Sequence, residues 1–298
     1  MVVGGAGFIG SHLTDRLLAE GHAVDVVDDL TSGSLGNLSE ARAVGGDLSI
    51  HTLSASAPQF PALVERRHPD VIYLMCALVP GRPAESTGGA SLGVVMTVLE
   101  AARALGGVKI VCPLSAVSLY GEVAARDLPV KEGHVWNPVG VRGAVTRSVS
   151  ELLSAYREVH AVEYTALAMA NVYGPRQRPD GGVVAAFADA FTARRAPVVH
   201  GDGKQTRDFL YIDDAVDALV RAAHRGGGLV VNVGTGVATS ILDLWDLLGG
   251  PSGRPAELGP RRAGDVPRFA LAPTRARIHL AWAPWTDLST GLRGLRTA

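Results

Sequence analysis

A run of glycines near the start of the chain limits the choice of fold more than any other feature. Residues 4–10 read Gly-Gly-Ala-Gly-Phe-Ile-Gly, between a short apolar run and an amphipathic stretch over residues 9–20. This pattern predicts a strand, a tight glycine turn and a helix. Such a turn lets a pyrophosphate approach the backbone and the free N–H groups at the start of the helix. The residues expected to hold the pyrophosphate of a dinucleotide are Gly4, Gly7, Phe8, Ile9 and Gly10.

An aspartate at the end of the next apolar run fits the same kind of site. Residues 23–27 read as a strand, and Asp28 ends it. A carboxylate there accepts hydrogen bonds from both ribose hydroxyls of an adenosine and repels a 2′-phosphate. The expected cofactor is therefore NAD rather than NADP. Asp47 and Leu48 follow two glycines, where a loop could reach the adenine, and an ordinary turn aspartate is the alternative at Asp47.

The order of strand-like and helix-like segments predicts the fold class. Short β-branched runs alternate with helical patterns up to Gly174, which indicates an α/β fold with a Rossmann-type doubly wound parallel sheet. Beyond that point the alternation weakens. We expect an NAD-binding domain over residues 1–174 and a smaller α/β substrate-binding domain over residues 175–298, with segments near 205–235 returning to the sheet. Because the first strand is short, a few upstream residues could be missing.

Composition argues against several classes of function. The chain has 28 basic and 29 acidic residues, so its net charge of −1 gives no electrostatic reason to expect nucleic acid or an anionic membrane as partner. No apolar run approaches the roughly 18 residues that span a bilayer, and no signal-peptide pattern is present. Cys76 and Cys112 lie in apolar runs without metal-ligand spacing. We therefore expect a cytoplasmic protein with neither a disulfide nor a metal site.

Several longer motifs, in order along nearly the whole chain, carry a family resemblance. GGAGFIGSHL and VVDDLTSG lie in the cofactor half, and VSLYGE, NVYGPRQRP, GDGKQTRDFLYIDD and RRAGDVPR lie largely in the substrate half. Together they resemble the extended short-chain dehydrogenase/reductase family, the NAD-dependent nucleotide-sugar epimerases and dehydratases. The resemblance implies bound NAD and a UDP- or dTDP-linked sugar as substrate. It also implies a homodimer formed through the helices expected at 91–105 and 145–159.

Three residues are expected to contact the substrate diphosphate. A guanidinium binds two phosphate oxygens at once, which suits Arg207 and Arg262, although a surface arginine is the alternative for each. Asn171, in the NVYGP motif, matches a family position near the substrate diphosphate. Asp208 and Asp214 also match the family, but we expect them to be structural partners rather than ligands.

The family's catalytic residues are replaced in this chain. The family uses a Tyr and a Lys four residues apart on a helix, with a Ser or Thr from a strand end, for proton exchange at the sugar hydroxyl. Counting back from Glu151, which matches the family's acid, places the Lys position at Arg147 and the Tyr position at Gly143. Counting back four residues from Tyr120 places the Ser or Thr position at Ala116.

A replacement proton carrier could come from the residues around this helix. Tyr120 is nearest in sequence to the missing serine, and Glu132 and His134 lie on the loop before the helix. Histidine has a suitable ordinary pKa of about 6.5. Arg147 could hold a ribose hydroxyl but could not act as a base, because its pKa lies above about 12.

Three functions remain open from the sequence. The first is an epimerase or dehydratase acting on a nucleoside diphosphate hexose with a relocated acid or base. The composition, rich in Arg, Ala and Gly as in a GC-rich genome, and the atypical site would place it in a secondary-metabolite pathway. The second is a protein that binds NAD and a nucleotide sugar without turnover. The third is a family member redirected to a non-sugar substrate, favoured by Ala168 in place of the usual arginine and by the bulkier segment 73–77.

Overall fold

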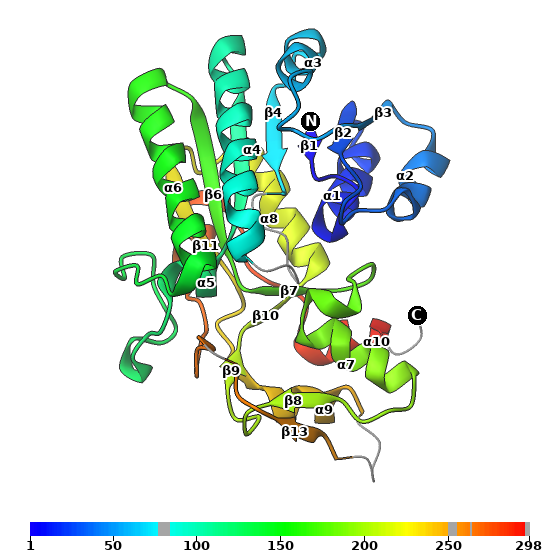
Figure 1. Ribbon diagram of the computed structural model, residues 1–298, viewed down its shortest axis with the longest axis vertical. Helices are drawn as coiled ribbons and strands as arrows, with labels where there is room; N and C mark the ends of the chain where they lie inside the picture. The colour runs from blue at the N-terminus through cyan, green and yellow to red at the C-terminus, as the bar shows by residue number, and fades with distance from the viewer. Residues whose placement is uncertain (77–83, 250–254, 263, 296–298) are drawn as a thin grey trace.

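Seven parallel strands form the central sheet of the computed structural model, which describes residues 1–76, 84–249, 255–262 and 264–295 (Figure 1). Their order is β11-β6-β5-β4-β1-β2-β3. In that order they are Leu229–Val233, Glu163–Met169, Lys109–Ser115, Val71–Leu74, Val2–Val3, Val24–Asp28 and Leu48–Thr52. The strand order reverses at β1, so the sheet is doubly wound and its ligand crevice is expected at the carboxyl ends of the strands beside β1. This confirms the predicted Rossmann-type fold.

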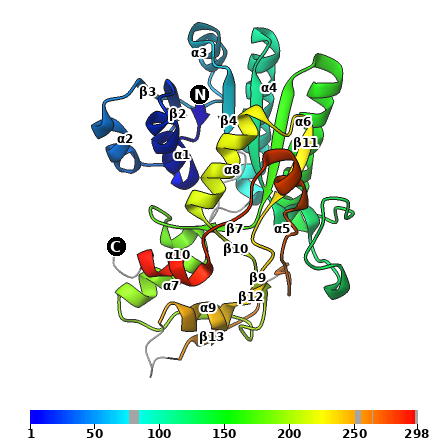
Figure 2. The same cartoon turned by 180° about the vertical axis from the view of Figure 1, so that it is seen from behind.

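Helices cover both faces of the sheet, as Figures 1 and 2 show from opposite sides. One face carries α3 (Phe60–Arg67), α4 (Ala84–Leu105) and α6 (Gly140–His160). The other carries α1 (Phe8–Ala19) and α8 (Ile212–His224). Two short helices, α2 (Ser39–Val44) and α5 (Ala116–Tyr120), complete this half.

The apolar character of α4 follows from its packing on the sheet. By length and composition alone, Gly88–Leu105 is apolar enough to cross a membrane, although the sequence analysis expected no run of that length. Within it, Val95, Val98 and Leu99 are fully buried in the core shared with α3 and α6. These contacts give α4 the role of a core helix in this fold.

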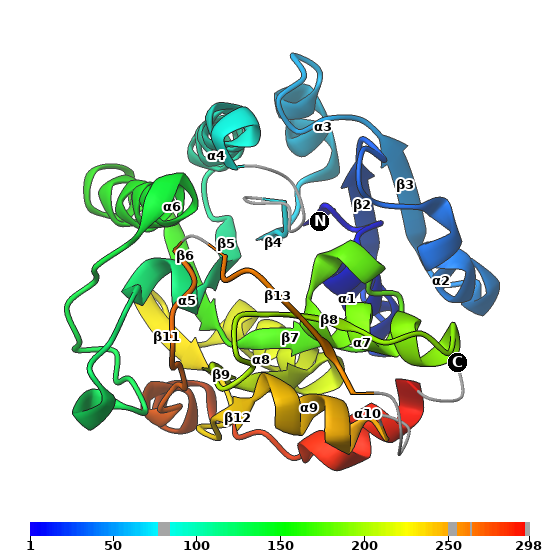
Figure 3. The same ribbon diagram turned by 60° about the horizontal axis from the view of Figure 1, so that its bottom comes forward.

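The second half of the chain builds a smaller lobe from three two-stranded pairs. These are β7 (Asn171–Tyr173) with β10 (Phe209–Tyr211), β9 (Thr206–Arg207) with β12 (Thr239–Ser240), and β8 (Val198–His200) with β13 (Glu257–Gly259). Helices α7 (Val183–Thr192), α9 (Ile241–Leu247) and α10 (Leu288–Leu295) pack on them, as Figure 3 shows from the lobe side. The lobe has its own core, in which the rings of Phe187 and Trp245 lie 5.6 Å apart.

The chain then returns to the large sheet. Strand β11 pairs in parallel with β6, and α8, which precedes it, packs against α1 and the sheet. Of the segments near 205–235 that were expected to return to the sheet, β11 does so, whereas β10 pairs with β7 outside it.

Candidate active site

The glycine turn joins β1 to α1 at the carboxyl edge of the sheet. Gly4 has a φ of +83°, a left-handed conformation that favours glycine. A Cβ atom on Gly10 would lie 2.2 Å from the carbonyl oxygen of Gly4, so α1 packs directly on the turn. Gly7 is the N-cap residue of α1, and the first N–H groups of a helix have no acceptor within the helix. The turn is therefore a cradle of backbone donors suited to a pyrophosphate.

Asp28 lies beside this cradle. Its Oδ2 atom accepts a hydrogen bond from the N–H of Ala6 at 2.9 Å, and its Oδ1 atom accepts one from Leu30 at 2.8 Å. Burial raises the pKa of Asp28, against the opposing effect of these two donors. A Cβ on Gly33 would come within 2.9 Å of Oδ1, so glycine keeps the space beside the carboxylate open. The structure thus brings the predicted turn and carboxylate together, and both fit the phosphate and ribose of NAD.

The prediction that Asp47 and Leu48 reach the adenine is wrong. Strands β2 and β3 are parallel, and Asp28 is in register with Thr52 at their carboxyl ends. Leu48 begins β3, and Asp47 lies exposed before it, at the opposite edge of the sheet from the glycine turn. The residues that reach the correct edge are Thr52 and Leu53, whose N–H donates to the carbonyl of Asp28 at 3.0 Å.

A hollow of about 510 Å³ adjoins this end of β3. It is lined by His51, Thr52 and Leu53 and by four residues of or next to α3, Gln59, Ala62, Leu63 and Arg66. The period-two alternation of Leu48, Ile50 and Thr52 is the sequence signal that could have revealed the strand and therefore these residues.

Arg207 is buried in the smaller lobe, where two of the sequence motifs meet. Its side chain is 9% exposed, its Nη1 atom donates to the carbonyl of Thr206 at 2.8 Å, and its Nη2 atom pairs with the carboxylate of Asp265. Burial lowers the pKa of Arg207, while Asp265 raises it. Arg262 is exposed, and its carbonyl accepts the N–H of Asp265 at 3.3 Å. Asp265 therefore contacts the side chain of Arg207 and the backbone of Arg262.

Asn171 lies close to the same place, and the nearby aspartates support the backbone. The N–H of Asn171 donates at 2.9 Å to the carbonyl of Asp208, the residue after Arg207. The buried carboxylate of Asp208 accepts hydrogen bonds from the Thr235 hydroxyl and from backbone N–H groups. The carboxylate of Asp214 accepts backbone N–H groups of residues 285 and 286. The expectation that both aspartates are structural is confirmed.

Tyr120 is fully buried, and its hydroxyl is connected through Asn232 to the loop at Val130. Its hydroxyl donates to Oδ1 of Asn232 at 2.8 Å, and Nδ2 of Asn232 donates to the carbonyl of Val130 at 2.9 Å. Burial raises the pKa of Tyr120 to about 12, and the charge of Glu132 adds to this effect. A hydroxyl held in this way argues against the proton-transfer role considered for Tyr120.

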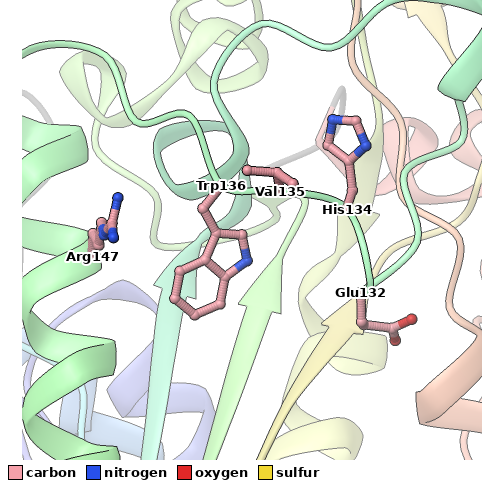
Figure 4. Close-up of a pocket in the computed structure, with 5 residues that line it drawn as sticks. All are labelled: Glu132, His134, Val135, Trp136 and Arg147. Carbon is pink, nitrogen blue, oxygen red and sulfur yellow. The ribbon is translucent and has the colours of Figure 1, made fainter.

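His134 and Arg147 do share a cleft. Its volume is about 280 Å³, and its lining residues are Glu132, His134, Val135, Trp136 and Arg147. Figure 4 shows Arg147 on α6 and the other four on the preceding loop. The carboxylate of Glu132 accepts the backbone N–H groups of Asn232 and Arg275, at 3.2 and 3.1 Å. Arg147 pairs with Glu151 at 2.7 Å, and both side chains are at least half exposed.

Gly143 faces the interior, one helical turn before Arg147. A Cβ on this glycine would lie 2.9 Å from the Cβ of Pro138 and 2.9 Å from the carbonyl oxygen of Ser118. Ser118 Oγ in turn donates to Ser115 Oγ at 2.9 Å, at the carboxyl end of β5. Position 143 therefore points toward the strand end where the family's proton chemistry is expected, but it has no space for a side chain. Ala116 is fully buried in the core.

The family model for the NAD-dependent epimerase/dehydratase family matches residues 1–234. The chain belongs to this family. The resemblance read from the motifs is thereby confirmed, and so is NAD as the cofactor of the family.

Individual relatives cover nearly the whole chain. A UDP-glucose 4-epimerase of Mycolicibacterium smegmatis is 40% identical over 98% of this chain and 95% of its own length. UDP-glucuronic acid decarboxylase 1 of Arabidopsis thaliana is 31% identical over 98% of this chain and 67% of its own length. Among solved structures, the UDP-glucose 4-epimerase of Thermotoga maritima with UDP-glucose has a TM-score of 0.91 at 30% identity, covering 99% of this chain and 96% of that one.

Proposed function

We propose that the protein binds NAD and a UDP-linked hexose and belongs functionally with the sugar 4-epimerases. The observation that carries this proposal is the arrangement around Arg207. Among the described residues, the buried guanidinium of Arg207 has one carboxylate partner, Asp265, and it lies one residue from the backbone bond to Asn171. Such a guanidinium suits a diphosphate that would share its charge. The 40% identity to a UDP-glucose 4-epimerase favours UDP over other nucleotides and a hexose as the sugar.

The cofactor residues are assigned from the geometry at the carboxyl edge. The N–H groups at the start of α1, at Phe8, Ile9 and Gly10, would hold the pyrophosphate. Asp28 would accept the ribose hydroxyls, and the hollow beside Thr52 would receive the adenine. When bound, NAD supplies the hydride acceptor and donor for the sugar. The chain's own residues would bind and orient the sugar and exchange protons with its hydroxyl group.

The chain around the start of α6 offers a second register for the missing catalytic pair. We place the Tyr and Lys positions one turn earlier, at Val139 and Gly143, rather than at Gly143 and Arg147. Val139 immediately precedes α6, and its Cγ2 atom would lie 3.5 Å from a Cβ on Gly121, so positions 139 and 143 both approach α5 and its end. Arg147 instead points to the cleft and to Glu151. In either register, neither residue can exchange a proton near neutral pH.

Proton transfer would then fall to groups outside the helix. His134 remains a candidate through the cleft it shares with Arg147, and the Ser115–Ser118 pair could orient a sugar hydroxyl at the end of β5. A serine needs a base to activate it, so this pair alone would not support fast turnover. General acid–base catalysis contributes about 10²–10⁴-fold, and we expect turnover to be reduced on that scale.

A second candidate function is binding of NAD and the nucleotide sugar without turnover. The packing at Gly143 favours this binding function. Pro138 and the backbone of Ser118 occupy the space that a catalytic side chain at position 143 would need. Measuring UDP-glucose and UDP-galactose interconversion with NAD present separates the two. Slow interconversion that falls further in His134→Ala supports the enzyme. Tight binding of UDP-glucose without interconversion supports the binding protein, and no binding of UDP- or dTDP-hexoses contradicts both.

We also propose a cytoplasmic homodimer formed through α4 and α6. Both helices present partly exposed apolar side chains on their outer surfaces, including Met96 and Val141. Sedimentation equilibrium tests this directly, with a charged substitution such as Met96→Glu expected to shift the mass toward the monomer. A monomeric mass for the unaltered protein at micromolar concentration would contradict the proposal.

A further inference from the structure

The loop that follows β7 is fastened to the cofactor helix α1. The carbonyl of Pro175 accepts a hydrogen bond from Nε2 of His12 at 3.0 Å. The next residue, Arg176, pairs through Nη1 with Oδ2 of Asp15 at 2.6 Å and through Nη2 with Glu40 at 2.9 Å. His12 and Asp15 are three residues apart on one face of α1, so the loop docks along that face.

Arg176 holds these contacts from an unfavourable backbone conformation. Its φ is +64°, in the left-handed region that non-glycine residues adopt only rarely. Its side chain is nevertheless only 14% exposed, and Nη1 also lies 3.3 Å from Oγ of Ser11. A backbone strain that is retained together with several side-chain contacts to another element indicates a functional role for the Arg176 side chain.

The elements that Arg176 joins carry the two ends of the proposed ligand site. Helix α1 begins at Phe8, one turn before Ser11, and its first N–H groups form the pyrophosphate cradle. On the other side, the loop follows β7, whose first residue is Asn171 and which pairs with β10 beside Arg207. In the sequence, His12 and Pro175 are 163 residues apart. The contact is thus a direct link between the cofactor half and the substrate lobe.

We propose that Arg176 is a positioning residue that ties the cofactor helix to the substrate lobe, so that NAD and the nucleotide sugar each bind more tightly when the other is bound. NAD would reduce the motion of the start of α1. The Arg176–Asp15 ion pair and the His12–Pro175 hydrogen bond would then reduce the motion of β7 as well. The sugar-nucleotide part rests on the proposed function above. Coupling between two sites is reciprocal and commonly reaches five-fold or more.

Arg176→Gly is the decisive variant, because glycine adopts the same backbone conformation without cost and removes only the side chain. Hydrogen–deuterium exchange measures the effect of NAD alone. In the unaltered protein, NAD should slow exchange in the loop and in β7 as well as in α1. In Arg176→Gly, the slowing should persist in α1 and disappear from residues 171–178. Asp15→Asn, which removes the charge of the partner on α1, should cause the same loss. Arg176→Lys, which keeps the positive charge, should retain part of the slowing in residues 171–178.

Arg178→Ala provides the matched control. Arg178 is exposed and pairs with Asp180 on its own loop, at 2.9 Å. This variant should retain the full response to NAD. If Arg176→Gly and Asp15→Asn also retain it, the proposal is overturned.

Calorimetric titration of UDP-glucose, with and without saturating NAD, measures the coupling itself. We expect an affinity ratio of about five or more in the unaltered protein and a ratio close to one in Arg176→Gly. An equal ratio in both proteins contradicts the proposal. If the unaltered protein binds no UDP-glucose, the proposed function fails, while the exchange experiment still decides the role of Arg176.

Discussion

Replacing Gly143 by alanine should destabilise the protein, although alanine favours helices. The new Cβ would lie 2.9 Å from the Cβ of Pro138 and from the carbonyl oxygen of Ser118, well inside the 3.5–4.0 Å of ordinary carbon contacts. A proline ring and a backbone carbonyl cannot move aside as a flexible side-chain end would. Overpacking of this kind costs about 1–3 kcal/mol, and the rigid neighbours place this site in the upper part of that range. Alanine's better helix propensity offsets about 1 kcal/mol. The free energy of unfolding should therefore fall by about 1–2 kcal/mol.

Gly93→Ala is the control for this measurement. Gly93 lies within α4, and apart from the backbone of its own helix a Cβ there would meet no heavy atom of the described residues within 4 Å. The same substitution should therefore raise the free energy of unfolding by about 0.5–1 kcal/mol. Urea unfolding, followed by circular dichroism, compares both variants with the unaltered protein. If Gly143→Ala is as stable as Gly93→Ala, the argument that the catalytic position is filled by its neighbours is refuted. Tyrosine and lysine begin with the same Cβ atom, so neither would fit at position 143 unless Pro138 or α5 moved.

Three further substitutions test the proposed ligand contacts of Asp28 and Arg207 and the contribution of Asp25 to stability. Asp28→Ala should reduce the ratio of NAD affinity to NADP affinity, measured by calorimetry. If the unaltered protein already binds NAD and NADP equally tightly, the proposed role of Asp28 is contradicted. Arg207→Ala should weaken UDP-glucose binding about ten- to hundred-fold, because a charge-assisted contact is worth roughly 1.5–3 kcal/mol; unchanged affinity would exclude a diphosphate contact. Burial raises the pKa of Asp25, but hydrogen bonds from Arg67 and His51 outweigh it and lower that pKa. Its stabilisation is present above the unfolded pKa of about 3.9 and lost as the pH falls toward the folded value, so Asp25→Asn should lose less stability between about pH 5 and pH 3 than the unaltered protein. Parallel pH profiles of the urea midpoint would show that Asp25 makes no such contribution.

The elements that follow strong local patterns could be predicted from the sequence. The glycine turn and the spacing of Leu13, Leu17 and Leu18 indicate α1, which the structure confirms at Phe8–Ala19. The edge strand β3 escaped prediction, because its five residues are at most partly buried and form no continuous apolar run. That single omission placed Asp47 at the wrong edge of the sheet. Helix α6 begins at Gly140, earlier than its apolar spacing suggests, because its first turn is anchored by Pro138 and Gly143 rather than by large apolar side chains.

The long-range part of the site could not be predicted from local sequence. Tyr120 appeared free to act as an acid, but its hydroxyl partner Asn232 lies 112 residues away in the chain. Arg176 and Asp15 are separated by 161 residues. Such pairs depend on how the two halves of the chain meet, and neither periodicity nor motif spacing contains that information.

The position of β11 in the large sheet has a consequence for the order in which the protein folds during its synthesis. Strand β6 is complete once the ribosome has added residue 169, but its outer neighbour β11 begins only at residue 229, after much of the smaller lobe has been made. Until then β6, buried at six of its seven positions in the finished protein, is an unpaired edge. Unpaired edges of this kind invite association with other chains. A nascent chain that stalls in the smaller lobe would therefore be prone to aggregate, even though its cofactor-binding turn is already formed.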